Sequence, residues 1–114
     1  MKQLTYLAIP YTWNPNKSFE IVNKIAAKLM NEGKIILSPI SHSHPIADYM
    51  DESLRTSQEF WMNQDEVLLS KCDEITIVVI NDDWQMIEES KGVQEEIRIA
   101  NELLIPITYY NYYE

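Results

Sequence analysis

The sequence has 114 residues, of which 46% are hydrophobic, which is enough for a buried core, so residues 1–114 are expected to form one domain. The net charge of −9 repels nucleic acid polymers and anionic lipid, and neither is an expected partner. The single cysteine, Cys72, excludes an intrachain disulfide and a thiolate metal cluster. The N-terminus lacks the long apolar core of a signal peptide, and no stretch reaches the length of a membrane span, so a cytoplasmic protein is expected.

The first half of the chain alternates between strand and helix patterns. An apolar run at residues 4–9, ended by a proline, predicts a buried strand. Apolar residues recur on one face from Ser18, a possible N-cap, to Gly33, a C-terminal glycine, and this predicts a helix. Residues 34–38 predict the second strand. Residues 40–55 have no clear period and are expected to be irregular.

The second half continues the alternation. A second helix is expected from Thr56 or Ser57 to about Lys71. Residues 75–80 are nearly all β-branched and predict a strand near the centre of the sheet. Residues 81–89 are expected to form an acidic loop. A helix at 91–104 and a strand at 105–110 complete the chain.

This order of elements predicts an α/β fold, with a parallel sheet of four to five strands covered by helices on both faces. Ligands of such sheets bind beyond the carboxyl ends of the strands, where the strand order reverses. The loops that follow Ile9, Leu37 and Ile80 are therefore expected to carry the functional site.

The entrance to the last predicted helix suits an anion. The chain has only two glycines, so a dinucleotide fingerprint and a P-loop are both excluded, and no cofactor is expected. A bound phosphate would use a helix N-terminus and hydroxyls, for which Ser90 and Gly92 are the candidates. Ser90 as an ordinary helix cap is the alternative.

Two acidic residues lie next to apolar helix faces. Glu96 flanks Val93 and Ile97, and partial desolvation there favours a nucleophile or an acid/base group. The alternative is a rim glutamate paired with a basic residue. Asp65 lies near the apolar stripe of the second helix, where an acid needs a partner or a purpose, although it can also be an exposed carboxylate.

Two loops offer further ligand contacts. His42 and His44 follow the second strand, and alternating histidines in an extended segment can ligate a metal. We expect instead that they contact a ligand or a carboxylate without metal. Tyr11 and Trp13, after the first strand, suit stacking on a planar base, or they form a lid over the edge of the core.

Several segments together resemble the nucleoside 2-deoxyribosyltransferase superfamily. They are Tyr6–Tyr11, Asn63–Asp65 with Leu68–Asp73, and Ser90–Ile97. Within it, the chain most resembles small phage and bacterial proteins that contain a segment like Ser38–Pro45. The resemblance covers nearly the whole chain. It implies a flavodoxin-like sheet and cleavage of the N-glycosidic bond of a nucleoside or nucleotide.

The resemblance also implies roles for individual residues. The catalytic glutamate of the family falls on Glu96, its helix aspartate on Asp65 and its first-strand tyrosine on Tyr6. Ser90 stands where the transferases usually have an acid and where the nucleotide 5′-phosphate N-hydrolases have a serine, which favours a phosphorylated substrate. The first loop, however, lacks the arginine of those hydrolases.

Three hypotheses follow for function. In the first, Glu96 attacks the anomeric carbon, Asp65 protonates or orients the departing base, and Tyr6 holds Glu96. In the second, the chain binds and sequesters a nucleotide without turnover. A weaker third hypothesis is a metal-dependent hydrolase centred on His42 and His44.

A homo-oligomer, either a dimer or an assembly of dimers, is also predicted. Trp61 and the terminal tyrosines, at 109, 110, 112 and 113, exceed what one small core is expected to cover. Aromatic residues of this kind are favoured at interface centres.

Overall fold

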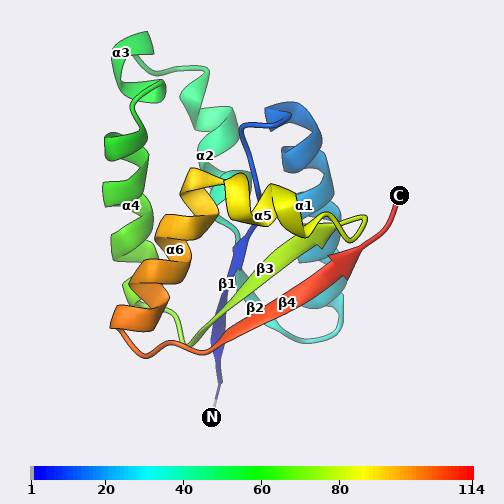
Figure 1. The fold of residues 1–114 in the computed structure, drawn as a ribbon. Coiled ribbons are helices and arrows are strands. Elements are labelled where there is room, and N and C mark those ends of the chain that lie inside the picture. The colour runs from blue at the N-terminus through cyan, green and yellow to red at the C-terminus, as the bar shows by residue number, and fades with distance from the viewer. Residues whose placement is uncertain (1) are drawn as a thin grey trace.

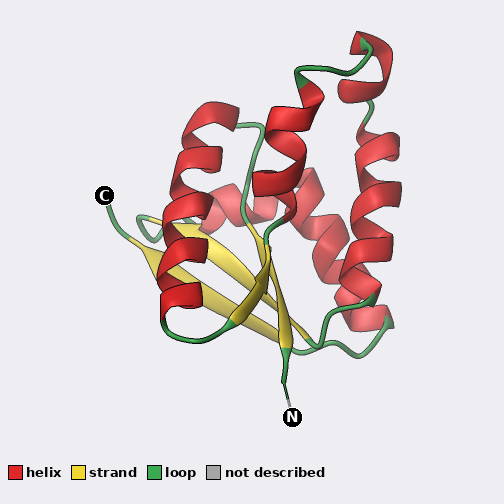
Figure 2. Cartoon of the chain, turned by 180° about the vertical axis from the view of Figure 1, so that it is seen from behind, coloured by secondary structure: helices red, strands yellow, loops and turns green. Residues whose placement is uncertain are grey.

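A computed structural model describes residues 2–114 and contains one four-stranded parallel sheet with helices on both faces. The strand order is β2-β1-β3-β4, and all three strand pairs are parallel. The elements in chain order are β1 (Leu4–Ala8), α1 (Pro15–Asn31), β2 (Ile35–Leu37), α2 (Pro39–Ala47), α3 (Glu52–Arg55), α4 (Gln58–Ser70), β3 (Glu74–Ile80), α5 (Trp84–Glu89), α6 (Lys91–Glu102) and β4 (Ile107–Tyr112). This arrangement confirms the predicted α/β flavodoxin-like three-layer sandwich (Figures 1 and 2).

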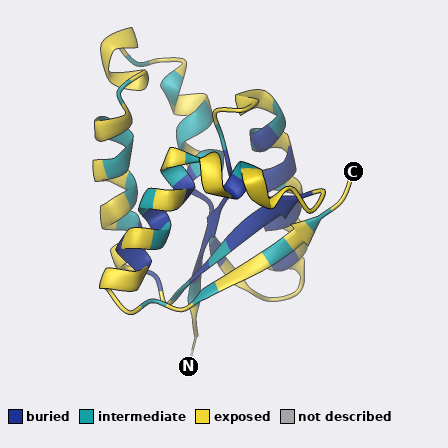
Figure 3. Cartoon of the chain, in the orientation of Figure 1, coloured by how far each residue is buried: buried dark blue, intermediate teal, exposed yellow. Residues whose placement is uncertain are grey.

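The alternation of side chains along the central strands builds two hydrophobic layers. Tyr6 and Ala8 of β1 face α4, α5 and α6, whereas Leu7 faces α1. Strand β3 divides in the same way, with Ile77 on the first face and Val78 on the second. Figure 3 shows both strands buried between the helices. Because β1 and β3 are covered on both faces, they read as continuous apolar runs in the sequence.

Three helices contradict the sequence-based expectation. Residues 40–55, expected to be irregular, contain α2 and α3, and the expected acidic loop at 81–89 contains α5. The helices lack an apolar stripe because α2 buries only Pro39, α3 buries no residue and α5 buries only Ile87. Helix α5 is instead fixed by its N-cap, since the Asp83 carboxylate accepts a hydrogen bond from the amide of Met86 at 3.0 Å.

The first helix begins before the expected residue. Helix α1 starts at Pro15 with Asn14 as its N-cap, so Ser18 is not a cap. The buried Ser18 hydroxyl instead donates a hydrogen bond to the carbonyl of Pro10 at 2.6 Å, and the indole Nε1 of Trp13 donates to the same carbonyl at 2.9 Å. These bonds hold the loop between β1 and α1 against the helix.

The last strand is shifted by two residues from its expected position, to Ile107–Tyr112, and it forms an edge of the sheet. Tyr109 and Tyr113 are exposed, whereas Tyr110 and Tyr112 pack against the core cluster on the α1 side. Trp61 is not surplus surface either, because it is partly buried and lines a cavity. The predicted homo-oligomer stays a prediction.

Within residues 2–114, no helix is both long enough and apolar enough to cross a membrane.

Candidate active site

A cavity of about 580 Å³ opens beyond the carboxyl end of β1. Its walls come from the β1–α1 loop, from α2 and α4, from Arg55 and Thr56 at the end of α3, and from the start of α6. This is the edge of the sheet at which parallel α/β folds bind ligands, and the chain order reverses there between β1 and its neighbours β2 and β3. The cavity is large enough for a nucleoside or nucleotide.

Glu96 contributes a buried carboxyl group to this cavity. The residue is 7% exposed, because Val93, Glu96 and Ala100 share the face of α6 that packs on the sheet. The hydroxyl of Tyr6, from β1, donates a hydrogen bond to the Glu96 carboxyl group. Burial raises the pKa of Glu96 from its ordinary value of 4.5 to about 8, the bond from Tyr6 opposes this increase, and the charge of Asp65 adds to it.

Tyr6 is a fixed hydrogen-bond donor to Glu96. Its side chain is fully buried in the core cluster on the α4 and α6 side. Burial, followed by the charges of Glu96 and Asp65, raises the pKa of Tyr6 far above its usual range. The hydroxyl therefore keeps its proton and orients one carboxyl oxygen of Glu96.

Asp65 brings a second carboxyl group to the same cavity from α4, which lies beside α6. Burial raises the pKa of Asp65 from 3.8 to about 6. Between about pH 6 and pH 8, Asp65 and Glu96 together therefore hold one proton. Because Glu96 has the higher pKa, this proton lies mainly on Glu96, and Asp65 is the ionised member of the pair. Two acids whose environments separate their pKa values are a usual arrangement for acid/base or nucleophilic chemistry.

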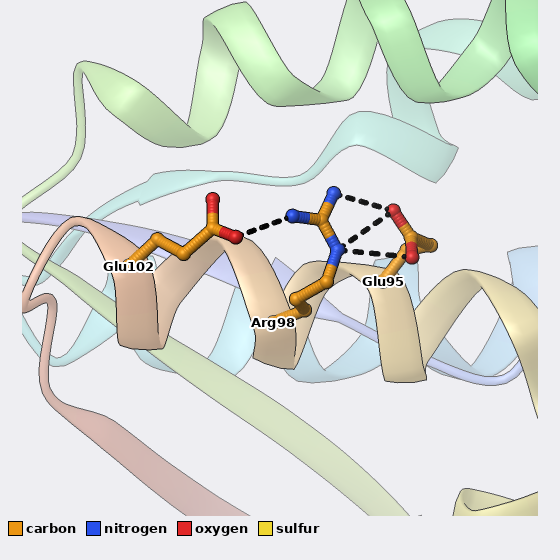
Figure 4. Close-up of polar contacts among 3 residues, drawn as sticks. All are labelled: Glu95, Arg98 and Glu102. Carbon is orange, nitrogen blue, oxygen red and sulfur yellow. Dashed lines mark hydrogen bonds and ion pairs between the residues drawn. The ribbon is translucent and has the colours of Figure 1, made fainter.

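The neighbouring glutamate on α6 has the opposite environment. Glu95 is ion-paired with Arg98 at 2.7 Å, and Arg98 also contacts Glu102 at 2.7 Å (Figure 4). The bond to Arg98 lowers the pKa of Glu95, whose side chain does not line the cavity. Of these two adjacent glutamates, Glu96 is therefore the buried one that lines the cavity, and Glu95 is the one in an ion pair.

Ser90 and Gly92 both line the cavity at the start of α6. The Ser90 hydroxyl accepts a hydrogen bond from the amide of Val93 at 3.3 Å, so Ser90 caps the helix. A Cβ added at Gly92 would meet no atom within 4 Å, and its φ is not in the left-handed region. Packing therefore does not require a glycine there, and the free space in front of it belongs to the cavity.

Tyr11 and His44 lie together on the wall formed by the β1–α1 loop and α2. The Tyr11 hydroxyl lies 2.6 Å from Nδ1 of His44. Phe19 of α1 stacks on the His44 ring with a centroid distance of 4.4 Å and an angle of 22° between the planes. Three separate segments thus fix the orientation of this imidazole.

His42 and Trp13 do not belong to this cavity, contrary to expectation. His42 is exposed, because the segment is a helix and two residues along a helix point in different directions. The extended geometry that would let His42 and His44 share a metal is therefore absent. In residues 2–114, no group of three or more His, Cys, Asp or Glu side chains is arranged to hold a metal ion. Trp13 lines a smaller adjoining cavity of about 200 Å³.

Two basic residues of the cavity were not predicted. Arg55, at the end of α3, and Lys91, at the start of α6, line the cavity, and neither forms an ion pair within the described part of the chain. Lys91 could have been found from its position next to Ser90. Arg55 gave no signal, because it lies in a segment without periodicity.

The burial of Glu96 predicts an effect on stability. Its pKa is 4.5 when unfolded and about 8 when folded, so the folded state keeps a proton that the unfolded state loses, and stability falls as the pH rises from about 4.5 to about 8. Glu96→Gln has no ionisable group at this position, so it should not show this fall in stability with rising pH. We expect the free energy of unfolding in urea at pH 8, relative to pH 5, to be higher in Glu96→Gln than in the wild type by a few kcal/mol, since one pKa unit corresponds to about 1.4 kcal/mol. Glu95→Gln is the control, and an equal pH dependence in Glu96→Gln and the wild type would contradict the burial of an ionisable carboxyl group.

The comparison with known families adds one result. A family model described as a domain of unknown function, DUF1937, matches residues 3–112. No curated protein matches the sequence. Since the matched region covers nearly the whole chain, the protein belongs to the DUF1937 family.

Proposed function

We propose that the chain cleaves the N-glycosidic bond of a nucleoside or a nucleoside 5′-monophosphate, with Glu96 as the nucleophile. The observation that carries this proposal is that Glu96 and Asp65 line the same cavity, with Glu96 buried and hydrogen-bonded to the hydroxyl of Tyr6 behind it. The resemblance of these three positions to nucleoside 2-deoxyribosyltransferases favours the same reaction class.

In the first step, the proton shared by the pair passes from Glu96 to Asp65, and a carboxylate oxygen of Glu96 attacks the anomeric carbon of the sugar. The bond between this carbon and the base nitrogen breaks through an oxocarbenium-like transition state, and the base takes the bonding electron pair. Asp65 supplies a proton to the departing base. The hydroxyl of Tyr6 donates to the other carboxylate oxygen and fixes the orientation of the group.

In the second step, water attacks the anomeric carbon and the ester bond to Glu96 breaks. The proton of the water molecule passes to Asp65, which restores the protonated Asp65 and ionised Glu96 that were present just before the attack. A second base in place of water would make the same site a transferase.

The charged rim favours a phosphorylated sugar. Arg55, Lys91 and the Ser90 hydroxyl line a cavity that also contains the two carboxyl groups, so an anionic substituent is better placed beside these residues than beside Glu96. Arg55 supplies the guanidinium group that the first loop lacks.

The experiment is incubation of the protein with a panel of nucleosides and their 5′-monophosphates, with detection of free base by chromatography. We expect base release from at least one 2′-deoxynucleoside or its monophosphate, with the monophosphate preferred. Binding by calorimetry without release of base from any member would contradict the enzyme proposal and would support a protein that sequesters nucleotides.

A further inference from the structure

The Tyr11–His44 pair makes a contact that the proposed reaction does not use. His44 is fixed by Phe19 on its ring face and by Tyr11 at Nδ1, yet neither His44 nor Tyr11 forms a hydrogen bond with the catalytic groups in the described chain. An imidazole so oriented at the wall of a ligand-sized cavity presents its second nitrogen in a defined direction.

The chemistry of the two groups decides which nitrogen carries the proton. The Tyr11 hydroxyl has no other hydrogen-bond partner among residues 2–114, so its proton is satisfied only if it donates to Nδ1. An imidazole nitrogen is also a better acceptor than a phenol oxygen. Burial, and then the charge of Asp48, raises the pKa of Tyr11, which keeps the hydroxyl protonated.

With Nδ1 as the acceptor, neutral His44 carries its hydrogen on Nε2. No other side-chain hydrogen bond joins the His44 ring to the described residues, so Nε2–H is free to bind a ligand. A neutral N–H group matches a neutral acceptor, whereas the cations suited to a phosphate, Arg55 and Lys91, come from α3 and α6.

We propose that Tyr11 fixes the Nε2–H tautomer of His44, and that this N–H recognises a carbonyl oxygen or an unprotonated ring nitrogen of the substrate base. The proposal rests on the nucleoside-binding role of the same cavity. His44 then selects the base, and Tyr11 acts on the ligand only through His44.

The chain offers a direct spectroscopic test, because it has only two histidines and the other, His42, is exposed. Nitrogen-15 NMR of histidine-labelled protein distinguishes the two neutral tautomers of an imidazole from each other and from the imidazolium form. We expect His44 to be in the Nε2–H form in the wild type and to lose this preference in Tyr11→Phe, while His42 is unchanged by the substitution. The Nδ1–H form in the wild type, or an unchanged His44 in Tyr11→Phe, would overturn the role of Tyr11.

Ligand probes then test recognition. 2′-Deoxyguanosine 5′-monophosphate and thymidine 5′-monophosphate are expected to shift the Nε2 signal of His44, whereas 2-deoxyribose 5-phosphate, which lacks a base, is not. A shift with the base-free sugar phosphate would instead assign His44 to the phosphate, and no shift with any nucleotide would remove His44 from the ligand site. Both results would overturn the proposal.

Substitutions of His44 measure how much this residue contributes to nucleotide binding. We expect His44→Ala to raise the Kd or KM of the nucleotide about threefold to tenfold, with little change in kcat, as for one lost neutral hydrogen bond. His44→Gln, which keeps an N–H donor near the position of Nε2, should recover much of this loss, and His42→Ala should match the wild type. Equal binding by His44→Ala and His42→Ala would refute the inference.

The experiments can refute the role of His44 and the proposed reaction independently of each other. The nitrogen shifts need no turnover, so a protein that binds nucleotides at His44 but releases no base would refute only the proposed reaction. Base release with a KM unaffected by His44→Ala would refute only the inference. A thermal melt of each variant shows whether it is folded.

Discussion

Glu96→Gln is expected to reduce base release by at least about 10³-fold, because an amide cannot form the ester intermediate with the sugar. Glutamine has nearly the same shape and can still accept the hydrogen bond from Tyr6, so the fold should persist. The measurement is the initial rate of base formation on the best substrate of the panel, with circular dichroism to verify folding.

Glu95→Gln is the matched control for this variant. It makes the same chemical change one residue earlier on α6, in a side chain that is paired with Arg98 and lies outside the cavity. We expect its rate to remain near that of the wild type. If Glu96→Gln kept more than about a tenth of the wild-type rate, Glu96 would not be the nucleophile.

Asp65→Asn is expected to lower kcat/KM by about 10² to 10⁴-fold and to change the pH profile. In the wild type the active form has one proton on the pair, so kcat/KM should rise as the pH passes about 6 and fall again as it passes about 8. Below this window both groups are protonated and no carboxylate attacks. Above it both are ionised and no acid protonates the base.

The alkaline limb of this profile is diagnostic. The amide side chain of the Asp65→Asn variant cannot donate an acidic proton at any pH, so its residual activity should lack the fall above about pH 8. In this variant the acid limb reports Glu96 alone. Removing the Asp65 charge lowers the pKa of Glu96 from about 8, but burial still keeps it raised, so the acid limb should move from about pH 6 to higher pH. Glu66→Gln, at the exposed neighbour on α4, should keep the bell-shaped profile. An unchanged profile in Asp65→Asn would exclude Asp65 as the acid.

The elements that the sequence predicted well are those buried by the fold. Strand β3 is buried along most of its length between two helical layers, so nearly every residue is apolar and β-branched. Helix α5 buries only Ile87 and resembles a loop in the sequence, because a short helix held by the Asp83 cap leaves no periodic signal. Elements with a buried face show a periodic spacing of apolar residues and can be predicted from it. Elements with little buried surface, such as α5, lack this spacing and are missed.

Some residues of the candidate site could likewise be predicted from the sequence, and others could not. Glu96 was identifiable because Val93 is buried one turn before it and the face of α6 is strongly amphipathic. Arg55 was not, since its place at the cavity depends on how α3 is positioned and not on its neighbours in sequence. The different positions of the two histidines could not be predicted without knowing that their segment is helical. Because it is a helix, His44 lines the cavity and His42 is exposed.

The central claim is that Glu96 forms a covalent bond to the sugar, and mass spectrometry tests it most directly. The protein is mixed with its best substrate, quenched in acid during turnover and digested. The peptide containing Glu96 is expected to carry the mass of the sugar in the wild type, and the corresponding peptide of Glu96→Gln is expected to carry no added mass. A sugar attached to a peptide without Glu96, or a released product of inverted anomeric configuration, would contradict it.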